Sequence, residues 1–156
     1  MKEIRIGLIG GGWMGKAHTT AFHNAKMIFG DDMPVFEIVS DVTEDAAKAF
    51  AEQMGYARYT ADWHDVVSDP DVDLVDVATP NCMHYEMAKA ALEHGKHVFC
   101  EKPLSLSAQQ SSELAQLAKQ LQDMGENVAY EQVMQAVSDF EKGNMRLSTV
   151  LAAMNG

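Results

Sequence analysis

The chain has 156 residues, of which 47% are hydrophobic, and a formal net charge of −11. This length and apolar fraction suit one globular domain with a core and exclude a disordered chain. The acidic balance argues against nucleic acid and anionic membrane surfaces as partners, and no apolar run approaches the roughly 20 residues of a membrane span. With two cysteines and a strand pattern in place of a signal peptide, we expect reduced thiols and a cytoplasmic protein.

The first expected element is a strand over residues 3–9, and a helix over 14–29 follows it. Between them lies G-x-G-x-x-G as Gly10, Gly12 and Gly15. In a dinucleotide site the first glycine allows a tight turn, the second lets a pyrophosphate approach the backbone, and the third lets the helix pack on the strand. The helix N-terminus then offers N–H groups to the phosphates. The pattern predicts nucleotide binding, and the alternative is a glycine-rich turn without a ligand.

Residues 35–40 are the second predicted strand, and Asp41 stands at its carboxyl end. In dinucleotide folds an acid at this place accepts hydrogen bonds from the adenosine ribose. Asp41 lies 26 residues after Gly15, which is more than the usual spacing. The alternative role is a helix cap, but Thr43 is suited to cap the helix predicted over 44–54. No arginine follows Asp41 to meet a 2′-phosphate, so we expect NAD, with NADP less favoured.

The later elements alternate between strands and helices, which predicts an α/β fold: a doubly wound parallel sheet in the order 3-2-1-4-5 with helices on both faces. They are a strand over 56–59, a helix over 62–67, a strand over 72–78, a helix over about 83–93, a strand over 97–100 and a helix over about 107–123. Thr79-Pro80-Asn81 and Glu101-Lys102-Pro103 follow two of these strands, at the edge where such sheets bind ligands. His18 and His23 lack further candidate ligands, so no metal is predicted.

Three motifs together resemble the glucose-fructose oxidoreductase/inositol dehydrogenase/rhizopine catabolism (Gfo/Idh/MocA) family. They are Gly10-Gly11-Gly12-Trp13-Met14-Gly15, Ala78-Thr79-Pro80-Asn81 with His84, and Glu101-Lys102-Pro103. The likeness covers roughly residues 3–120, and Glu-Lys-Pro after a parallel strand is its most specific mark. Members of the family are NAD(P)-dependent oxidoreductases that act mostly on sugars, cyclitols and related polyols, with a Rossmann-like cofactor domain.

The resemblance implies a role for each matching residue. Gly10, Gly12 and Gly15 would hold the pyrophosphate with Trp13 and Met14 on the same turn, Asp41 would bind the adenosine ribose, Thr79, Pro80, Asn81 and His84 would border the cofactor, and Glu101 and Lys102 would lie near the nicotinamide ribose and substrate. It implies that Lys102 contacts the substrate and assists proton transfer, whereas without the motif a solvated loop lysine is the plainer interpretation. It also implies a cis peptide bond before Pro103.

The family's second domain, which supplies most substrate contacts, has no recognisable counterpart in this sequence. We therefore expect a dinucleotide-binding domain over 1–124 and a helical C-terminal tail over 125–156, which does not resemble the family's continuation. Three interpretations stay open: an oxidoreductase present as its cofactor domain, a non-catalytic dinucleotide-binding module or subunit, and a remnant without activity. An apolar stripe in the tail and an uncovered fifth strand favour a homodimer, and the alternative is a tail helix that folds back over its own sheet edge.

Overall fold

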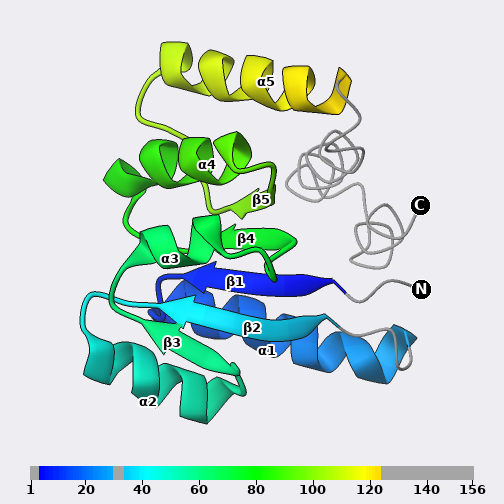
Figure 1. Cartoon of the computed structure of the whole chain (residues 1–156), viewed down its shortest axis with the longest axis vertical. Coiled ribbons are helices and arrows are strands. Elements are labelled where there is room, and N and C mark those ends of the chain that lie inside the picture. The colour runs from blue at the N-terminus through cyan, green and yellow to red at the C-terminus, as the bar shows by residue number, and fades with distance from the viewer. Residues whose placement is uncertain (1–3, 30–33, 124–156) are drawn as a thin grey trace.

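The computed structural model describes residues 4–29 and 34–123, which form one parallel sheet covered by helices (Figure 1). The strands are β1 (Arg5–Ile9), β2 (Val35–Ser40), β3 (Arg58–Thr60), β4 (Leu74–Val77) and β5 (His97–Cys100). Every neighbouring pair runs parallel, and the order is β3-β2-β1-β4-β5. The predicted fold class and strand order are confirmed.

The helices lie on both faces of the sheet, as a doubly wound fold requires (Figure 1). They are α1 (Trp13–Phe29), α2 (Glu44–Met54), α3 (Trp63–Ser68), α4 (His84–Glu93) and α5 (Ala108–Asp123), with a 3₁₀ turn at Asn81–Met83. One core cluster joins Ile6 and Leu8 of β1 to Phe50 of α2, with Phe22 of α1 packed against it. The opposite cluster joins Val75 of β4 to α3, α4 and α5. Both faces of the central strands are therefore apolar, which is why these strands have near-continuous hydrophobic sequences.

The third strand begins two residues later than the sequence predicts. Gly55 ends α2 in the left-handed region at φ 84°, and its N–H donates to the carbonyl of Ala51. The N–H of Tyr56 donates to the same carbonyl, and the Tyr56 side chain is buried in the core. Tyr56 therefore completes the helix cap, and pairing with β2 begins only at Arg58.

The carboxyl ends of the strands meet at one edge of the sheet and carry the segments that the sequence singles out (Figure 1). The turn into α1 follows β1, Asp41 follows β2, Ala78–Asn81 follows β4, and Glu101 follows β5. The predicted tail over 125–156 lies outside the described residues. Among the helices that the structure describes, none is long and apolar enough to span a bilayer.

Candidate functional site

The turn between β1 and α1 is built on a glycine whose backbone no other residue adopts easily. Gly10 has φ +102°, and a Cβ there would lie 2.8 Å from the carbonyl oxygen of Ala78, at the end of β4. The Gly10 N–H donates to the carbonyl of Ser40, the last residue of β2, at 2.9 Å. The turn thus lies in close contact with the ends of both neighbouring strands, which any side chain would disrupt.

Gly12 and Gly15 lack side chains for opposite reasons. A Cβ on the buried Gly15 would collide with the carbonyl oxygen of Gly10 and lie 3.2 Å from Leu8 Cδ2, so Gly15 allows α1 to pack on β1. A Cβ on the exposed Gly12 would meet nothing within 4 Å. The fold therefore requires Gly15, whereas packing within the described chain does not explain Gly12. The open space at Gly12 fits a ligand that approaches the backbone.

The first turn of α1 begins directly beside this open space. Trp13 is its first residue and is 80% exposed, while Met14 is half-buried. The turn carries no acidic side chain that would oppose an anion. The backbone N–H groups of a first helical turn have no partner within the helix, so they are available to phosphate oxygens.

Asp41 lies at the end of β2, across the glycine turn from α1. A Cβ on Gly11 would come within 2.7 Å of Asp41 Oδ2, and Asp41 Oδ1 accepts a hydrogen bond from the N–H of Val42 at 2.7 Å. Thr43, not Asp41, is the N-cap of α2, since its hydroxyl accepts from the N–H of Ala46. The helix-cap alternative for Asp41 is therefore wrong. Val42, which the sequence analysis does not single out, is 87% exposed beside Asp41.

A buried histidine, His84, contacts the backbone of the segment that follows β4. Pro80 and Asn81 are exposed and Thr79 is half-buried, whereas His84 has no exposed surface. The His84 ring nitrogens lie 2.8 Å from the carbonyl oxygen of Thr79 and 2.7 Å from that of Pro103. His84 therefore links the segments that follow β4 and β5, while Pro80 and Asn81 stay exposed.

Glu101 and Lys102 lie immediately after β5. The Glu101 N–H donates to the carbonyl of Val77, which extends the pairing of β5 with β4 by one residue. The Lys102 side chain is 75% exposed, and its Nζ lies 3.8 Å from Glu101 Oε2. The Lys102–Pro103 peptide bond is cis, as the resemblance implies.

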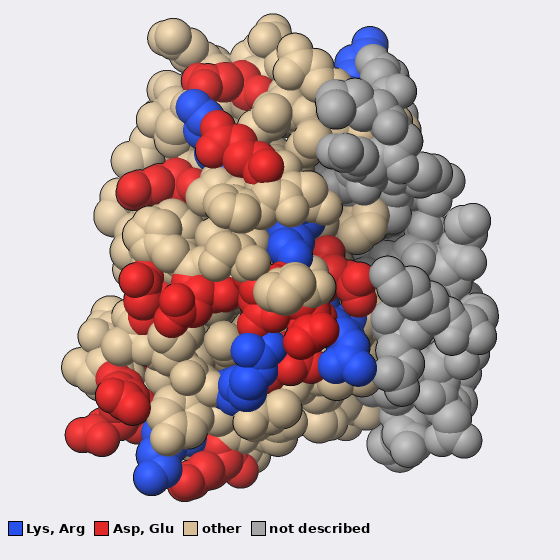
Figure 2. All heavy atoms as spheres, in the orientation of Figure 1, with Lys and Arg blue, Asp and Glu red and all other residues tan. Residues whose placement is uncertain are grey.

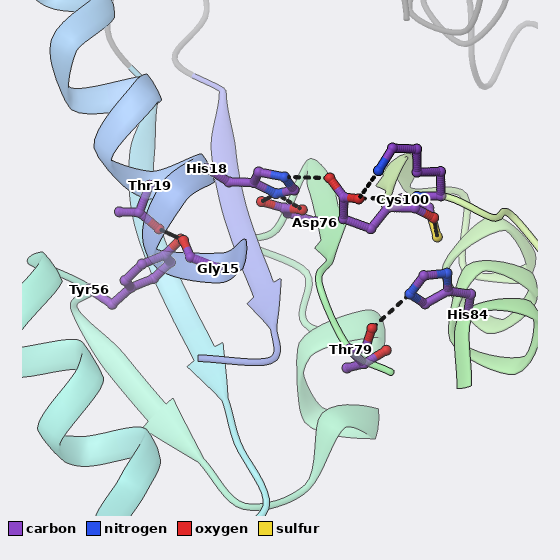
Figure 3. A network of polar contacts seen from close by, with 10 residues as sticks. Gly15, His18, Thr19, Tyr56, Asp76, Thr79, His84 and Cys100 are labelled. Atoms are coloured by element: carbon purple, nitrogen blue, oxygen red, sulfur yellow. Dashed lines mark hydrogen bonds and ion pairs between the residues drawn. The ribbon is translucent and has the colours of Figure 1, made fainter. Parts of the chain in front are cut away.

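A buried polar cluster that the sequence analysis does not predict connects α1, β4 and the segment after β5 (Figure 3). His18 Nδ1 lies 3.0 Å and 3.1 Å from the two carboxylate oxygens of Asp76, which is fully buried in β4. His18 Nε2 lies 3.0 Å from Glu101 Oε1. The signal in the sequence is an acid within an apolar strand, because a buried carboxylate requires a partner.

The electrostatics of this cluster favour a charged histidine. Burial acts to lower the pKa of His18, but hydrogen bonds and charges of Asp76 and Glu101 outweigh it and raise that pKa to about 9. Burial raises the pKa of the Asp76 carboxyl, and the hydrogen bond with His18 opposes the rise. Burial, with the nearby acids, also raises the pKa of the Cys100 thiol to about 12. At neutral pH His18 is therefore charged, and the Cys100 thiol is neutral.

The chain as a whole is acidic, with a formal net charge of −11. Figure 2 shows acidic side chains over much of the face in view, with most of the basic ones beside them. An anionic ligand at the carboxyl edge would therefore depend on local backbone donors and the end of α1. Such contacts act at short range, where the net charge of the whole chain is largely screened.

Residues 4–128 match the family described as "Oxidoreductase family, NAD-binding Rossmann fold". Levoglucosan dehydrogenase of Pseudarthrobacter phenanthrenivorans is 40% identical over 121 residues, which cover 76% of this chain and 31% of that protein. Inositol 2-dehydrogenase of Rhodococcus jostii is 34% identical over 154 residues, which cover 94% of this chain and 41% of that protein. Residues 1–124 make up less than 94% of the chain, so this second alignment extends into residues 125–156. The motifs quoted above for the family do not reach that tail.

The similar solved structures include complexes with bound dinucleotides. A levoglucosan dehydrogenase in complex with NADH has a TM-score of 0.73 and 39% identity, covering 76% of this chain and 32% of that chain. Biliverdin reductase from Synechocystis in complex with biliverdin and NADP+ has a TM-score of 0.67 and 32% identity, covering 76% and 35%. The chain spans about a third of the length of the first curated relatives that it matches. The chain belongs to the glucose-fructose oxidoreductase/inositol dehydrogenase/rhizopine catabolism family, and its described part is the family's NAD-binding Rossmann domain.

Proposed function

We propose that the chain binds NAD(H) along the carboxyl edge of its sheet as the cofactor domain of a sugar or polyol dehydrogenase. The observation that carries this proposal is the contrast within the glycine turn. Gly10 and Gly15 are close-packed, whereas Gly12 opens onto free space at the start of α1. A turn that serves the fold alone would gain from a side chain at Gly12, because glycine costs conformational entropy.

Each half of the dinucleotide has candidate partners at this edge. The pyrophosphate would lie over Gly10, Gly12 and Gly15, with Trp13 and Met14 on the same turn. The adenosine ribose would donate hydrogen bonds to Asp41, because Thr43 supplies the helix cap and leaves this carboxylate available. We propose that the other half lies over β4 and β5, the strands on the opposite side of β1 from β2. There Thr79, Pro80, Asn81, Glu101 and Lys102 would border it.

We infer a preference for NAD over NADP from the end of β2. A 2′-phosphate would face the Asp41 carboxylate, and the next residues, Val42 and Thr43, carry no positive charge to compensate. Relatives with NADH and with NADP+ are both known, so family membership does not decide the preference. The carboxylate at Asp41 is the local feature that supports NAD.

Lys102 is the residue we propose for contact with the substrate and for proton transfer. When bound, the nicotinamide ring supplies the hydride acceptor for an alcohol carbon. The long, exposed Lys102 side chain reaches from a backbone fixed by Glu101, so its amine can contact an alcohol placed beside the edge. Relatives named levoglucosan dehydrogenase and inositol 2-dehydrogenase support a cyclic polyhydroxy compound as the substrate class.

The described domain supplies one side of a substrate cleft. Hydride transfer also requires an alcohol that is held in position and shielded from water. We therefore propose that the contacts completing the substrate site lie outside the described residues. We also propose a homodimer held by residues 125–156, because β5 is the last strand at one side of the described sheet. Light scattering of the full chain and of a version ending at Met124 tests this: a monomeric full chain, or a dimer unchanged by truncation, refutes the tail-mediated contact.

Titration of the purified chain with NADH, followed by a polyol dehydrogenase screen, tests the proposed function. Binding together with turnover supports a competent dehydrogenase, and binding without turnover supports a cofactor domain that needs further contacts. Failure to bind NADH or NAD at millimolar concentration contradicts the proposal and leaves the remnant without activity as the remaining interpretation.

A further inference from the structure

The cluster of His18, Asp76 and Glu101 is costly to build for a purely structural link. Asp76 is fully buried, and the His18 side chain is only 11% exposed. Removing charges from water is expensive, and a buried ion pair often stabilises a fold no better than apolar residues of similar volume. Such a cluster therefore invites a role beyond holding α1 on the sheet.

His18 uses both ring nitrogens, and its partners lie on different elements. Nδ1 faces Asp76 on β4, and Nε2 faces Glu101 after β5. The edge of the Phe99 ring packs against the imidazole, with the ring centroids 5.1 Å apart, and fixes it from a third side. A ring with carboxylates at both nitrogens donates two hydrogen bonds only when both nitrogens carry protons. The contacts with Asp76, Glu101 and Phe99 therefore hold the His18 ring in one orientation.

Glu101 contacts both His18 and Lys102. Its Oε1 accepts from His18, while its Oε2 lies 3.3 Å from the Lys102 backbone nitrogen and 3.8 Å from Lys102 Nζ. The two oxygens of the Glu101 carboxylate thus connect α1 with the segment after β5. His18 lies about one helical turn after Gly15, on the helix that begins at the glycine turn.

We propose that His18 is a positioning residue that links α1 and β4 to Glu101 and Lys102, and so prepares the edge of β4 and β5 for the nicotinamide riboside half of the cofactor. This inference rests on the proposed dinucleotide site. His18 lies outside the surface proposed to contact the dinucleotide. We expect it to change the affinity for the nicotinamide riboside half alone. The adenosine half, at Asp41 on the far side of β1, does not depend on it.

The first test compares the affinity of the full chain for NADH with its affinity for ADP, which lacks the nicotinamide riboside. His18→Gln keeps the size and polarity of the side chain but cannot donate to both carboxylates. We expect NADH binding to weaken about tenfold, the usual effect of losing one charge-assisted hydrogen bond, and ADP binding to stay within about twofold. His23→Gln is the matched control, because His23 lies on the same helix and contacts the Met54 carbonyl away from the site.

A double-mutant cycle shows whether His18 acts through Glu101. Glu101→Gln removes the charge that receives the His18 hydrogen bond. If the two residues act in series, His18→Gln adds no further change to the ratio of NADH to ADP affinity in the Glu101→Gln background. Multiplicative effects of the two substitutions overturn the proposed coupling.

NMR of the free chain with ¹⁵N-labelled histidine gives a readout that does not depend on the cofactor. The His18 signals are those missing from His18→Gln, and we expect both ring nitrogens to be protonated at pH 7.5, with loss of this state in Asp76→Asn. A neutral His18 overturns the inference. If wild type binds NADH and His18→Gln leaves the affinity ratio unchanged, the inference alone fails. If wild type binds neither ligand, the proposed function fails and this inference fails with it.

Discussion

Replacing Gly12 by alanine should weaken NADH binding without harm to the fold, whereas the same change at Gly15 should damage the fold itself. At Gly12 the new methyl group meets no atom of the described chain within 4 Å, and its φ lies outside the left-handed region. At Gly15 the methyl group would overlap the carbonyl oxygen of Gly10 and press on Leu8. The two substitutions are chemically identical and lie three residues apart, so each serves as the control for the other.

The expected magnitudes follow from these contacts. Gly12→Ala should change the free energy of unfolding by less than about 1 kcal/mol, with a small gain from the restricted unfolded chain. In the complex the methyl group would enter the space proposed for the pyrophosphate, at an overpacking cost of about 1–3 kcal/mol, which raises the Kd for NADH roughly 5- to 150-fold. Gly15→Ala should lower the free energy of unfolding by about 1–3 kcal/mol, because backbone atoms at the turn must move.

Urea denaturation followed by circular dichroism measures the unfolding free energies, and NADH fluorescence titration measures the affinities. The reasoning would be refuted by a Gly12→Ala chain that folds normally and binds NADH as tightly as wild type. The pyrophosphate would then not cross Gly12, and the open space at the turn would have another explanation.

Three further predictions concern Asp41, Lys102 and His18. Asp41→Ala should weaken NADH binding by about 1–3 kcal/mol and reduce the preference over NADPH in calorimetric titrations, with Asp45→Ala as the neutral control; tighter binding of NADPH by wild type would remove Asp41 from the ribose role. The chain alone should show little turnover on sugars or cyclitols, and a robust rate abolished by Lys102→Ala would contradict this. Burial lowers the pKa of His18, but Asp76 and Glu101 outweigh it and raise the folded-state pKa to about 9. The contribution of His18 to stability should therefore be complete below pH 6.5 and lost as the pH rises through 9. In urea denaturation, the free energy of unfolding should fall by about 1–2 kcal/mol over this range in wild type but not in His18→Gln.

The fold could be predicted well because its signals are local. β2, α2 and β5 have the predicted bounds, since apolar strands and the cap residues Thr43 and Gly55 mark their ends in the sequence. The late start of β3 could not be predicted, because Tyr56 is β-prone by composition but belongs to the cap of α2. The burial of Tyr56 in the core, and not its strand propensity, determines where β3 begins.

The sequence motifs single out exposed residues at the carboxyl edge of the sheet, but they do not reveal the buried residues that contact them. Asp76 and Glu101 are separated from His18 by 58 and 83 residues, so no spacing rule connects them. His84 shows that a motif does not reveal whether its side chain is exposed. The resemblance implies that His84 borders the cofactor, whereas in the structure it is buried between the carbonyl groups of Thr79 and Pro103. We propose that His84 acts on the cofactor edge through the positions of Thr79 and Pro103.

The most direct test of the proposed site is to map amide chemical shifts of the ¹⁵N-labelled chain during titration with NADH. We predict that the changes gather at the carboxyl edge, over residues 10–15, 41–42, 79–81 and 101–102. Arg5 and Arg58, at the amino ends of β1 and β3, should stay unchanged as internal controls. Changes centred on that opposite edge, or no change at millimolar NADH, would contradict a dinucleotide site at the glycine turn.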